Sequence, residues 1–454
     1  MQLHPDKLRI FLVPLLITIC TTAHGGTESV KPVTEDLTPT IEQTLKPYTG
    51  PVHKGVNTKT LNGKVMCGYQ GWFTCYGDES ERGWFHWGFT PTGGCNFDFW
   101  PDMSEMDPDE RYPTPFKYAD GRAAEVFSSY NRKTVLRHFK WMRDYGIDGA
   151  FVQRFASQTS EPIPLRQFNT VLSHCREGAN TYGRTYAVMY DMNFDAATLK
   201  HVTNDWKTLV DKMRLTSDPA YLHHNGKPVI ALWGFGFTHR DWDADAVKQF
   251  LKFLKSGKYE CTIMLGLPTG WRTLEGDCRK DKTILDLIEK ADIVSPWTVG
   301  RYGTLDGVTK HAANKWKPDM EWCRKHGKDY LPVVFPGFSW YNMHGGQKPL
   351  NQIPRLGGRF LWKQYFEAKK LGATMIFQAM FDEVDEGTAI FKCTNDPPVG
   401  NFVTYEGLPS NYYLWLVGEG GRLIRDEIEI TKDMPKCGSV WNNITSNCNV
   451  QPPY

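Results

Sequence analysis

Eight short apolar runs recur along the chain, separated by longer segments of mixed polarity. Each run is continuous rather than alternating, as expected for a parallel strand whose two faces are both covered. The segments between the runs carry apolar residues at helical spacing, as Val135, Phe139 and Met142 do within 131–146. Strands that alternate with helices predict an α/β fold with a parallel sheet. The runs are KVMCGYQ (64–70), DGAFVQR (148–154), TYAVMYD (185–191), KPVIALW (227–233), CTIMLGL (261–267), ADIVSPW (291–297), YLPVVFP (330–336) and ATMIFQAMF (373–381).

Eight strand–helix pairs favour closure into a (β/α)8 TIM barrel over residues 61–430. The alternative is an open doubly wound sheet, which usually carries a glycine-rich phosphate turn after its first strand. The motif CGYQGWF at 67–73 does not have that pattern. Further helices are expected at Asp195–Met213, Asp243–Ser256, Lys282–Lys290, Lys310–His326, Ile353–Leu371 and 410–424.

A long loop follows the first run, with about 60 residues before the next helix. The loop is dense in tryptophan and acidic residues. Long connections of this kind are usually functional insertions or lids. We therefore expect the loop after strand 1 to contribute to a functional site.

The two ends of the chain differ in composition from the barrel. Lys7 and Arg9 precede an apolar run from Ile10 to Cys20 that is too short to cross a membrane. This pattern predicts a signal peptide over residues 1–25 and secretion, to the exterior or, in a bacterium, to the periplasm. Residues 26–60 form a polar arm and 431–454 a tail that contains cysteine. No later stretch has the length and apolarity of a transmembrane helix, so no membrane partner is expected after signal removal.

The chain contains eleven cysteines, of which ten remain after Cys20 is removed with the signal. An even number in a secreted chain indicates some disulfide bonds. Cys437 with Cys448 and Cys261 with Cys278 are candidate pairs, although connectivity does not follow from sequence. No CxxC or HExxH motif occurs, so neither a metal site nor a cofactor is expected. The formal net charge is +2 without any block of Lys or Arg, which argues against a nucleic-acid partner.

Aromatic residues gather where the predicted strands end. The carboxyl ends of the strands carry the active site in such barrels, and flat aromatic rings pack well against sugars. A single tryptophan there is more often packing, but tryptophans at four or more strand ends predict a carbohydrate cleft. Asp191 could instead begin a helix, and Arg154 could pair with Asp191. His86 is expected to be a surface or hydrogen-bonding histidine. The predicted substrate-binding residues at the strand ends are Tyr69, Trp72, Arg154, Tyr190, Asp191, Trp233, Trp271, Trp297 and Trp340.

The hexapeptide DEVDEG at 382–387 follows the last apolar run and holds four acids. Cleavage of a glycosidic bond requires a proton donor and a second carboxylate. Closely spaced carboxylates raise one another's pKa, which leaves a proton to donate near neutral pH. Glu383 and Glu386 are therefore the predicted catalytic pair, and Gly387 permits a sharp turn. The alternative interpretation is a solvated acidic turn.

Three motifs resemble glycoside hydrolase family 99 and the related family 71/99-like group. They are FDEVDEGT at 381–388, GYQGWF at 68–73 and GIDGAFVQRF at 146–155. In the family's endo-α-mannosidases the first of these reads Asn-Glu-Trp-His-Glu-Gly-Thr, so Val384 and Asp385 depart from it. The resemblance implies a retaining enzyme in which Glu383 assists attack by the sugar's own 2-hydroxyl through an anhydro-sugar intermediate. It also implies that Glu386 is the general acid/base, with Asp385 added to the predicted substrate-binding residues.

Together these observations predict a secreted, monomeric glycoside hydrolase that acts on an oligo- or polysaccharide. Two other hypotheses stay open. A non-catalytic carbohydrate-binding barrel would keep the aromatic residues without needing both glutamates. A different barrel hydrolase could use Asp191.

Overall fold

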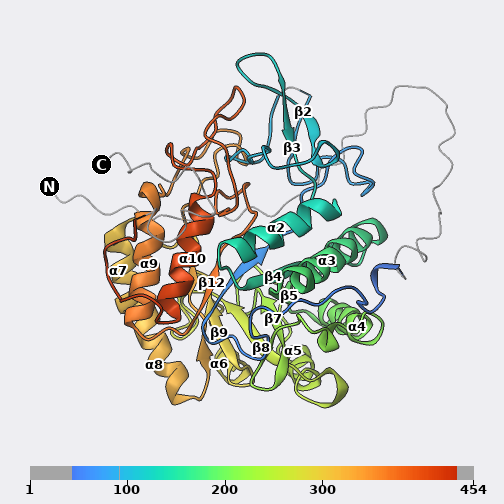
Figure 1. Cartoon of the computed structure of the whole chain (residues 1–454). Coiled ribbons are helices and arrows are strands. Elements are labelled where there is room, and N and C mark those ends of the chain that lie inside the picture. The colour runs from blue at the N-terminus through green and yellow to red at the C-terminus, as the bar shows by residue number, and fades with distance from the viewer. Residues whose placement is uncertain (1–42, 92, 437–454) are drawn as a thin grey trace.

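A computed structural model describes residues 43–91 and 93–436 of the 454-residue chain (Figure 1). The predicted signal peptide, the first part of the polar arm, and Cys437 and Cys448 lie outside these described residues. In the described part of the chain, no helix combines the length and apolarity needed to cross a membrane.

A ring of parallel strands occupies the centre of the molecule. Neighbours along the sheet follow the order β10-β9-β8-β7-β5-β4-β1-β12-β11, and every adjacent pair is parallel. The strands are β1 (Lys64–Tyr69), β4 (Gly149–Phe155), β5 (Thr185–Asp191), β7 (Lys227–Trp233), β8 (Thr262–Leu267), β9 (Ile293–Pro296), β10 (Asp329–Tyr330), β11 (Val333–Val334) and β12 (Met375–Gln378).

The two ends of this path are halves of one strand, which closes the barrel. Only Leu331 and Pro332 separate β10 from β11. The Leu331 amide donates to Val294 on one side at 2.9 Å, and the Pro332 carbonyl accepts from Phe377 on the other side at 3.0 Å. Proline has no amide to donate to a ladder, which explains the interruption. All eight predicted runs are therefore strands of a (β/α)8 barrel, and that prediction is confirmed.

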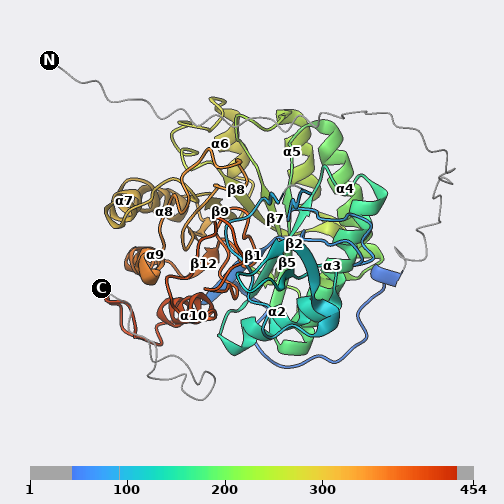
Figure 2. The same ribbon diagram turned by 90° about the horizontal axis from the view of Figure 1, so that it is seen from above.

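Helices surround the ring, as Figure 2 shows from above. Side-chain caps fix several starts: Asn131 accepts from the Lys133 amide before α2, and Asp195 caps α4 in the same way. A short π-helix at Ala312–Trp316 joins α7 to α8. The helices are α2 (Arg132–Asp144), α3 (Pro162–Tyr182), α4 (Ala196–Asp211), α5 (Ala244–Phe253), α6 (Thr283–Ile288), α7 (Leu305–His311), α8 (Lys317–Lys325), α9 (Arg359–Lys370) and α10 (Tyr412–Ile424).

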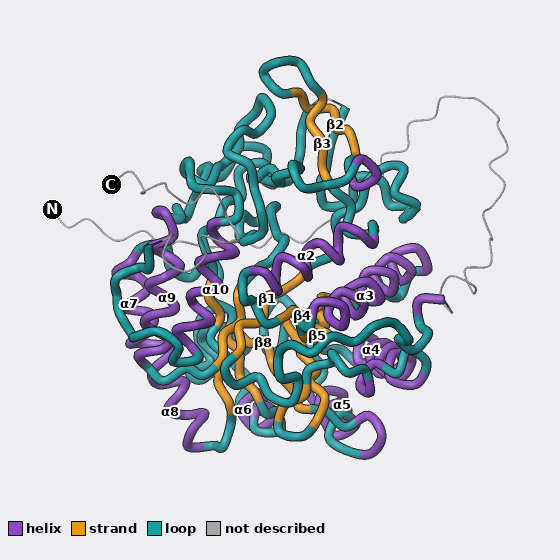
Figure 3. Tube along the Cα trace, viewed as in Figure 1, coloured by secondary structure: helices purple, strands orange, loops and turns teal. Residues whose placement is uncertain are grey.

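The insertion between β1 and α2 is folded, and it rises above one end of the barrel (Figures 1 and 3). It contains an antiparallel hairpin of β2 (Tyr112–Lys117) and β3 (Ala123–Val126). Buried aromatic rings pack inside it, with the Trp87 and Phe97 centroids 4.9 Å apart. The prediction of a long loop is therefore incomplete, because the segment builds a small core of its own. A second short antiparallel strand, β6 (His223–His224), pairs with β7.

The predicted Cys261–Cys278 disulfide is wrong. Cys261 lies at the amino end of β8 and Cys278 follows the carboxyl end of that strand, so the strand separates them. Six residues of strand span roughly 20 Å, far beyond the reach of a disulfide. The eight cysteines in the described residues are all buried free thiols: Cys67, Cys75, Cys95, Cys175, Cys261, Cys278, Cys323 and Cys393.

Candidate active site

The acidic turn that follows β12 is buried. The side chains of Asp382, Glu383 and Asp385 are between 0% and 4% exposed, and Glu386 is partly exposed. The turn folds back on itself, because the Thr388 and Ala389 amides donate to the Glu383 carbonyl at 3.1 and 2.9 Å. The alternative of a solvated acidic turn is therefore wrong.

Asp382 joins the last strand of the barrel to the first. Its two carboxylate oxygens accept from the backbone amides of Gln70 and Gly71, at 2.8 and 2.9 Å, where the chain leaves β1. Burial raises the pKa of Asp382 to about 7 against the opposing effect of these donors. The bonding gives Asp382 a structural role, since neither oxygen lacks a partner.

Glu383 is held by donors from two directions. The Gln70 side-chain amide donates to Oε1, and the Thr388 hydroxyl donates to Oε2 at 2.5 Å. Burial raises the pKa of Glu383, and the charges of Glu386 and Asp385 raise it further. The two donors favour the anion of Glu383.

Glu386 lies nearest to solvent among the four acids of the turn. Burial, followed by the charge of Asp385, raises the pKa of Glu386 to about 8. Asp191 adds in the same direction, while the nearby Trp340 indole acts against it. A carboxyl group with this pKa still carries its proton at neutral pH.

A cavity of about 140 Å³ opens beside Glu383 and Glu386. Its walls come from the carboxyl ends of β1, β4, β5, β7, β9 and β12, which is the face where such barrels carry their sites. The wall is aromatic and acidic, with neither lysine nor arginine in it. The lining residues are Gln70, Trp72, Gln153, Phe155, Asp191, Trp233, Trp297, Met380, Glu383 and Glu386.

The cavity contains four of the predicted substrate-binding residues: Trp72, Asp191, Trp233 and Trp297. Asp191 pairs with Arg240 at 2.7 Å, so the predicted pairing of Asp191 with Arg154 is wrong. Two more predicted residues, Trp340 and Asp385, do not line the cavity but lie near Glu386, since both influence its pKa.

The other four predicted residues have partners away from the cavity. The Tyr69 hydroxyl bonds His138 on α2 at 2.9 Å, and the Trp271 indole donates to Asp319 on α8 at 3.1 Å. Arg154 and Tyr190 both bind Asp205 on α4.

Strand alternation explains this sorting. Successive side chains of a strand point to opposite faces. Tyr69, Arg154 and Tyr190 each stand one residue before a residue that lines the cavity, namely Gln70, Phe155 and Asp191. The first three residues therefore point outward to the helices.

Several lining residues are absent from the predicted set: Gln70, Gln153, Phe155 and Met380. Alternation from Trp72 would have found Gln70, two residues earlier, whereas Gln153 and Phe155 depend on the register between β4 and β5, in which Phe155 pairs with Asp191. Met380 lies within the final run and has no comparable signal.

Several buried polar atoms around the cavity have no hydrogen-bond partner in the protein. They are Gln70 Oε1, Trp72 Nε1, Trp233 Nε1 and Asp385 Oδ1. The Trp340 indole, although near Glu386, also makes no hydrogen bond of standard geometry. Unpaired groups beside aromatic faces suit a ligand that offers both hydroxyl groups and apolar ring faces.

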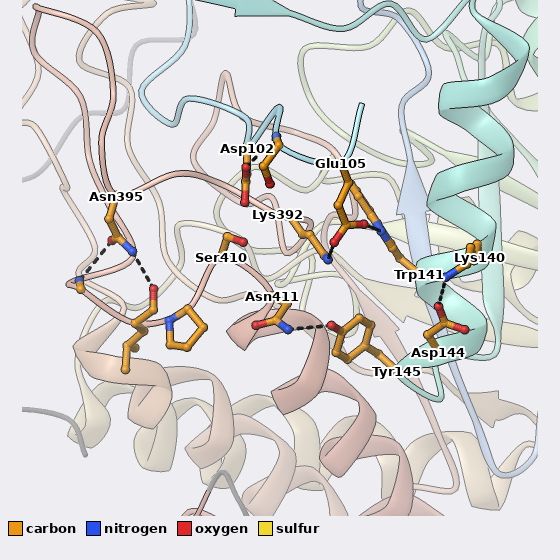
Figure 4. A pocket seen from close by; sticks show the side chains of 14 residues that line it. Asp102, Glu105, Lys140, Trp141, Asp144, Tyr145, Lys392, Asn395, Ser410 and Asn411 are labelled. Carbon is orange, nitrogen blue, oxygen red and sulfur yellow. Dashed lines mark hydrogen bonds and ion pairs between the residues drawn. The ribbon is translucent and has the colours of Figure 1, made fainter. Parts of the chain in front are cut away.

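A larger hollow of about 520 Å³ lies between α2 and the start of α10 (Figure 4). Its charged side chains largely neutralise one another: Lys392 pairs with Glu105, and Lys140 with Asp144 at 2.6 Å. None of the acids of the 382–386 turn lines it. In the described part of the chain, no three His, Cys, Asp or Glu side chains are grouped as a metal site.

Comparison with known proteins gives a structural match. The sequence matches no protein-family model and no curated protein. The fold is similar to the GH99 endo-alpha-mannosidase from Bacteroides thetaiotaomicron, with a TM-score of 0.60 and 16% identity over 81% of this chain and 99% of that one. A glycoside hydrolase-like protein matches with a TM-score of 0.51 and 14% identity over 84% and 98% of the two chains. The resemblance predicted from the three motifs is thus confirmed at the level of the fold, because the barrel of this chain is similar to that of the GH99 endo-alpha-mannosidase.

Proposed function

We propose that this chain is a glycoside hydrolase of oligo- or polysaccharides, with Glu386 as general acid/base and Glu383 as its partner. One observation carries the proposal. Two carboxylates from a single buried turn line a cavity at the carboxyl end of the barrel, together with Trp72, Trp233 and Trp297. Two carboxylates that flank the scissile bond are the usual requirement for glycosidic cleavage.

The different surroundings of the two glutamates support different roles. Glu386 retains its proton at neutral pH, so it can protonate the leaving oxygen of the scissile bond. Glu383 receives two hydrogen bonds, which favour its anion when one proton is shared between the pair. Glu383 is therefore the base and Glu386 the acid in the first step.

The resemblance to family 99 supports a retaining route. Glu383 takes the proton of the sugar's 2-hydroxyl while that oxygen attacks the anomeric carbon, and Glu386 gives its proton to the departing oxygen. Water then attacks the anomeric carbon of the anhydro sugar. Glu386 removes a proton from this water, and Glu383 returns its proton to the 2-oxygen. The motif spacing and the structural similarity support this proposal.

The aromatic wall would bind the sugar by its faces, with Asp191 accepting from a hydroxyl group. The N-terminal pattern around Lys7, Arg9 and the apolar run to Cys20 supports secretion of the enzyme. The substrate of a secreted enzyme would be an extracellular glycan.

The test compares Glu386→Gln and Glu383→Gln with Asp306→Asn, a control that alters an exposed acid on α7. The panel holds aryl glycosides and oligosaccharides, and the product anomer is followed by NMR. Glu386→Gln should lose roughly 10²–10⁴-fold in kcat/KM on alkyl leaving groups and far less on dinitrophenyl ones, which need no proton. Glu383→Gln should lose activity on both, and Asp306→Asn on neither.

Other outcomes separate the alternatives. Binding of glycans by the wild type without turnover would favour the non-catalytic barrel. Full activity of both glutamine variants, with loss in Asp191→Asn, would assign the chemistry to Asp191. A first product of inverted configuration would remove the retaining route.

A further inference from the structure

The insertion after β1 contributes a histidine to the acidic turn. His86 Nδ1 and Asp385 Oδ2 are 2.9 Å apart, although 299 positions separate the two residues in sequence. Asp385 is 1% exposed, and its second oxygen, Oδ1, has no hydrogen-bond partner in the protein. His86 is thus the hydrogen-bond partner of a carboxyl group that stands directly between Glu383 and Glu386 in sequence.

The position of His86 is tightly determined. Its ring stacks on Trp72 with centroids 3.5 Å apart and planes at 7°. Its φ of 62° lies in the left-handed region, which few residues other than glycine adopt, although histidine tolerates it better than most. Residues in sparsely populated φ/ψ regions keep that conformation where the surrounding contacts fix it, and they occur often at functional sites.

The charged groups around this pair are mostly acids. The turn supplies Asp382, Glu383 and Glu386, and β5 supplies Asp191, itself paired with Arg240. Arg82 is the cation that faces His86, and together with burial it lowers the pKa of His86 to about 3. Burial raises the pKa of Asp385 to about 8. His86 is therefore neutral, and one proton lies between the two side chains.

We propose that His86 and Asp385 form a positioning pair for the Glu383–Glu386 site, so that the insertion after β1 completes that site. The inference rests on the proposed function for its catalytic consequence. Once Asp385 ionises, near pH 8, its negative charge opposes ionisation of both glutamates, which extends the protonated range of Glu386 on the alkaline side. The hydrogen bond from His86 to Asp385 Oδ2 influences this ionisation, and stacking on Trp72 fixes the His86 ring in position.

The test uses three substitutions that change either the charge or the hydrogen-bond donor of the pair. Asp385→Asn removes the charge. His86→Asn retains a donor near the Nδ1 position and tolerates positive φ, whereas His86→Asp tolerates the same φ but places a second carboxylate against Asp385. Asp120→Asn, at the exposed tip of the insertion hairpin, is the control.

The first readout is the pH profile of kcat/KM, whose alkaline limb reports the acid of the free enzyme. Asp385→Asn should move that limb to lower pH by about one unit, because the charge that opposes ionisation is gone. His86→Asp should move it to higher pH, and His86→Asn and Asp120→Asn should leave its position near that of the wild type. Opposite shifts are not produced by loss of packing. A uniform loss of activity with unmoved limbs would overturn the proposal.

The second readout needs no substrate. Because folding raises the pKa of Asp385, its contribution to stability is complete below its unfolded pKa, near 3.9, and is lost as pH rises through about 8. The Tm of the wild type should therefore fall from pH 6 to 9 by more than that of Asp385→Asn, and His86→Asp should fall most steeply. If these Tm differences appear while no glycan is cleaved, the pair stands and the proposed function fails. Parallel Tm curves for the wild type and Asp385→Asn would overturn the pair whatever the activity.

Discussion

At the scale of single residues, the face of the strand decides which side chain belongs to the site. Arg154 and Gln153 are adjacent on β4, yet Gln153 lines the cavity while Arg154 points away to α3 and α4. There the Arg154 guanidinium binds Asn169 and both oxygens of Asp205. A charge in a fully buried network of this kind supports the fold and has no contact with a ligand.

Separate substitutions of Arg154 and Gln153 should affect different properties, the first the free energy of unfolding and the second substrate binding. Arg154→Met leaves the Asp205 carboxylate with Tyr190 but without its cation, and should reduce the free energy of unfolding by about 3–5 kcal/mol. Its KM should not change under conditions where the variant is folded. Gln153→Ala should raise KM with little effect on unfolding. Urea denaturation and steady-state kinetics measure both; a raised KM in folded Arg154→Met would return that residue to the site.

The structure brings together only part of the predicted set of site residues, and the reason is physical. The positions of the glutamate pair and of Trp72, Trp233 and Trp297 could be predicted because they follow apolar runs whose carboxyl ends must converge. Tyr69, Arg154 and Tyr190 were misplaced because position along a strand was considered and the alternation of faces was not. His86 could not be placed at the acidic turn, because its contact with Asp385 depends on how the insertion folds.

At the scale of elements, the turn after β12 depends on its contact with the loop after β11. The Ser339 amide donates to the Glu386 carbonyl at 3.0 Å, and Gly387 adopts a φ of 68° beside it. A Cβ on Gly387 would lie 2.8 Å from Ser339 N and 3.1 Å from Ser339 Cβ. Glycine is therefore required both by conformation and by space.

Gly387→Ala should displace Glu386 and lower kcat, since about 1 Å of misplacement can cost on the order of 10²-fold. Gly121→Ala is the matched control, because Gly121 has a φ of 85° but no atom within 4 Å of an added Cβ. Both variants carry the conformational cost of positive φ, and only Gly387→Ala carries the clash. Comparison of kcat and Tm in the two variants checks this. Equal effects would show that the contact with Ser339 is unimportant.

The elements of the barrel could be predicted well, whereas those of the insertion could not. Continuous apolar runs are a strong signal because strands inside a barrel are covered on both faces. The hairpin of β2 and β3 gives only a weak sequence signal. The sequence of β2 is YPTPFK, and its two prolines normally argue against a strand. Its pairing with β3 contains a register irregularity between Pro113 and Lys117.

At the scale of the whole molecule, burial in the fold protects the cysteine thiols from oxidation. The eight cysteines of the described residues are buried, and burial raises the pKa of thiols such as Cys67, Cys175 and Cys393. A thiol that stays protonated is a poor nucleophile. The fold can therefore keep these cysteines reduced even in the oxidising surroundings proposed for it, provided that it stays closed.

A reductant should accordingly leave the Tm of the barrel unchanged, since no bond that constrains the unfolded chain is present among these eight residues. In native protein, a maleimide reagent should label none of the eight, and in urea it should label all of them without prior reduction. Peptide mass spectrometry resolves each site and also tests the predicted Cys437–Cys448 pair, which should resist labelling until reduced. A drop in Tm with reductant in a Cys437→Ser/Cys448→Ser variant would contradict the assignment, because only the eight cysteines of the described residues could then account for the lost constraint.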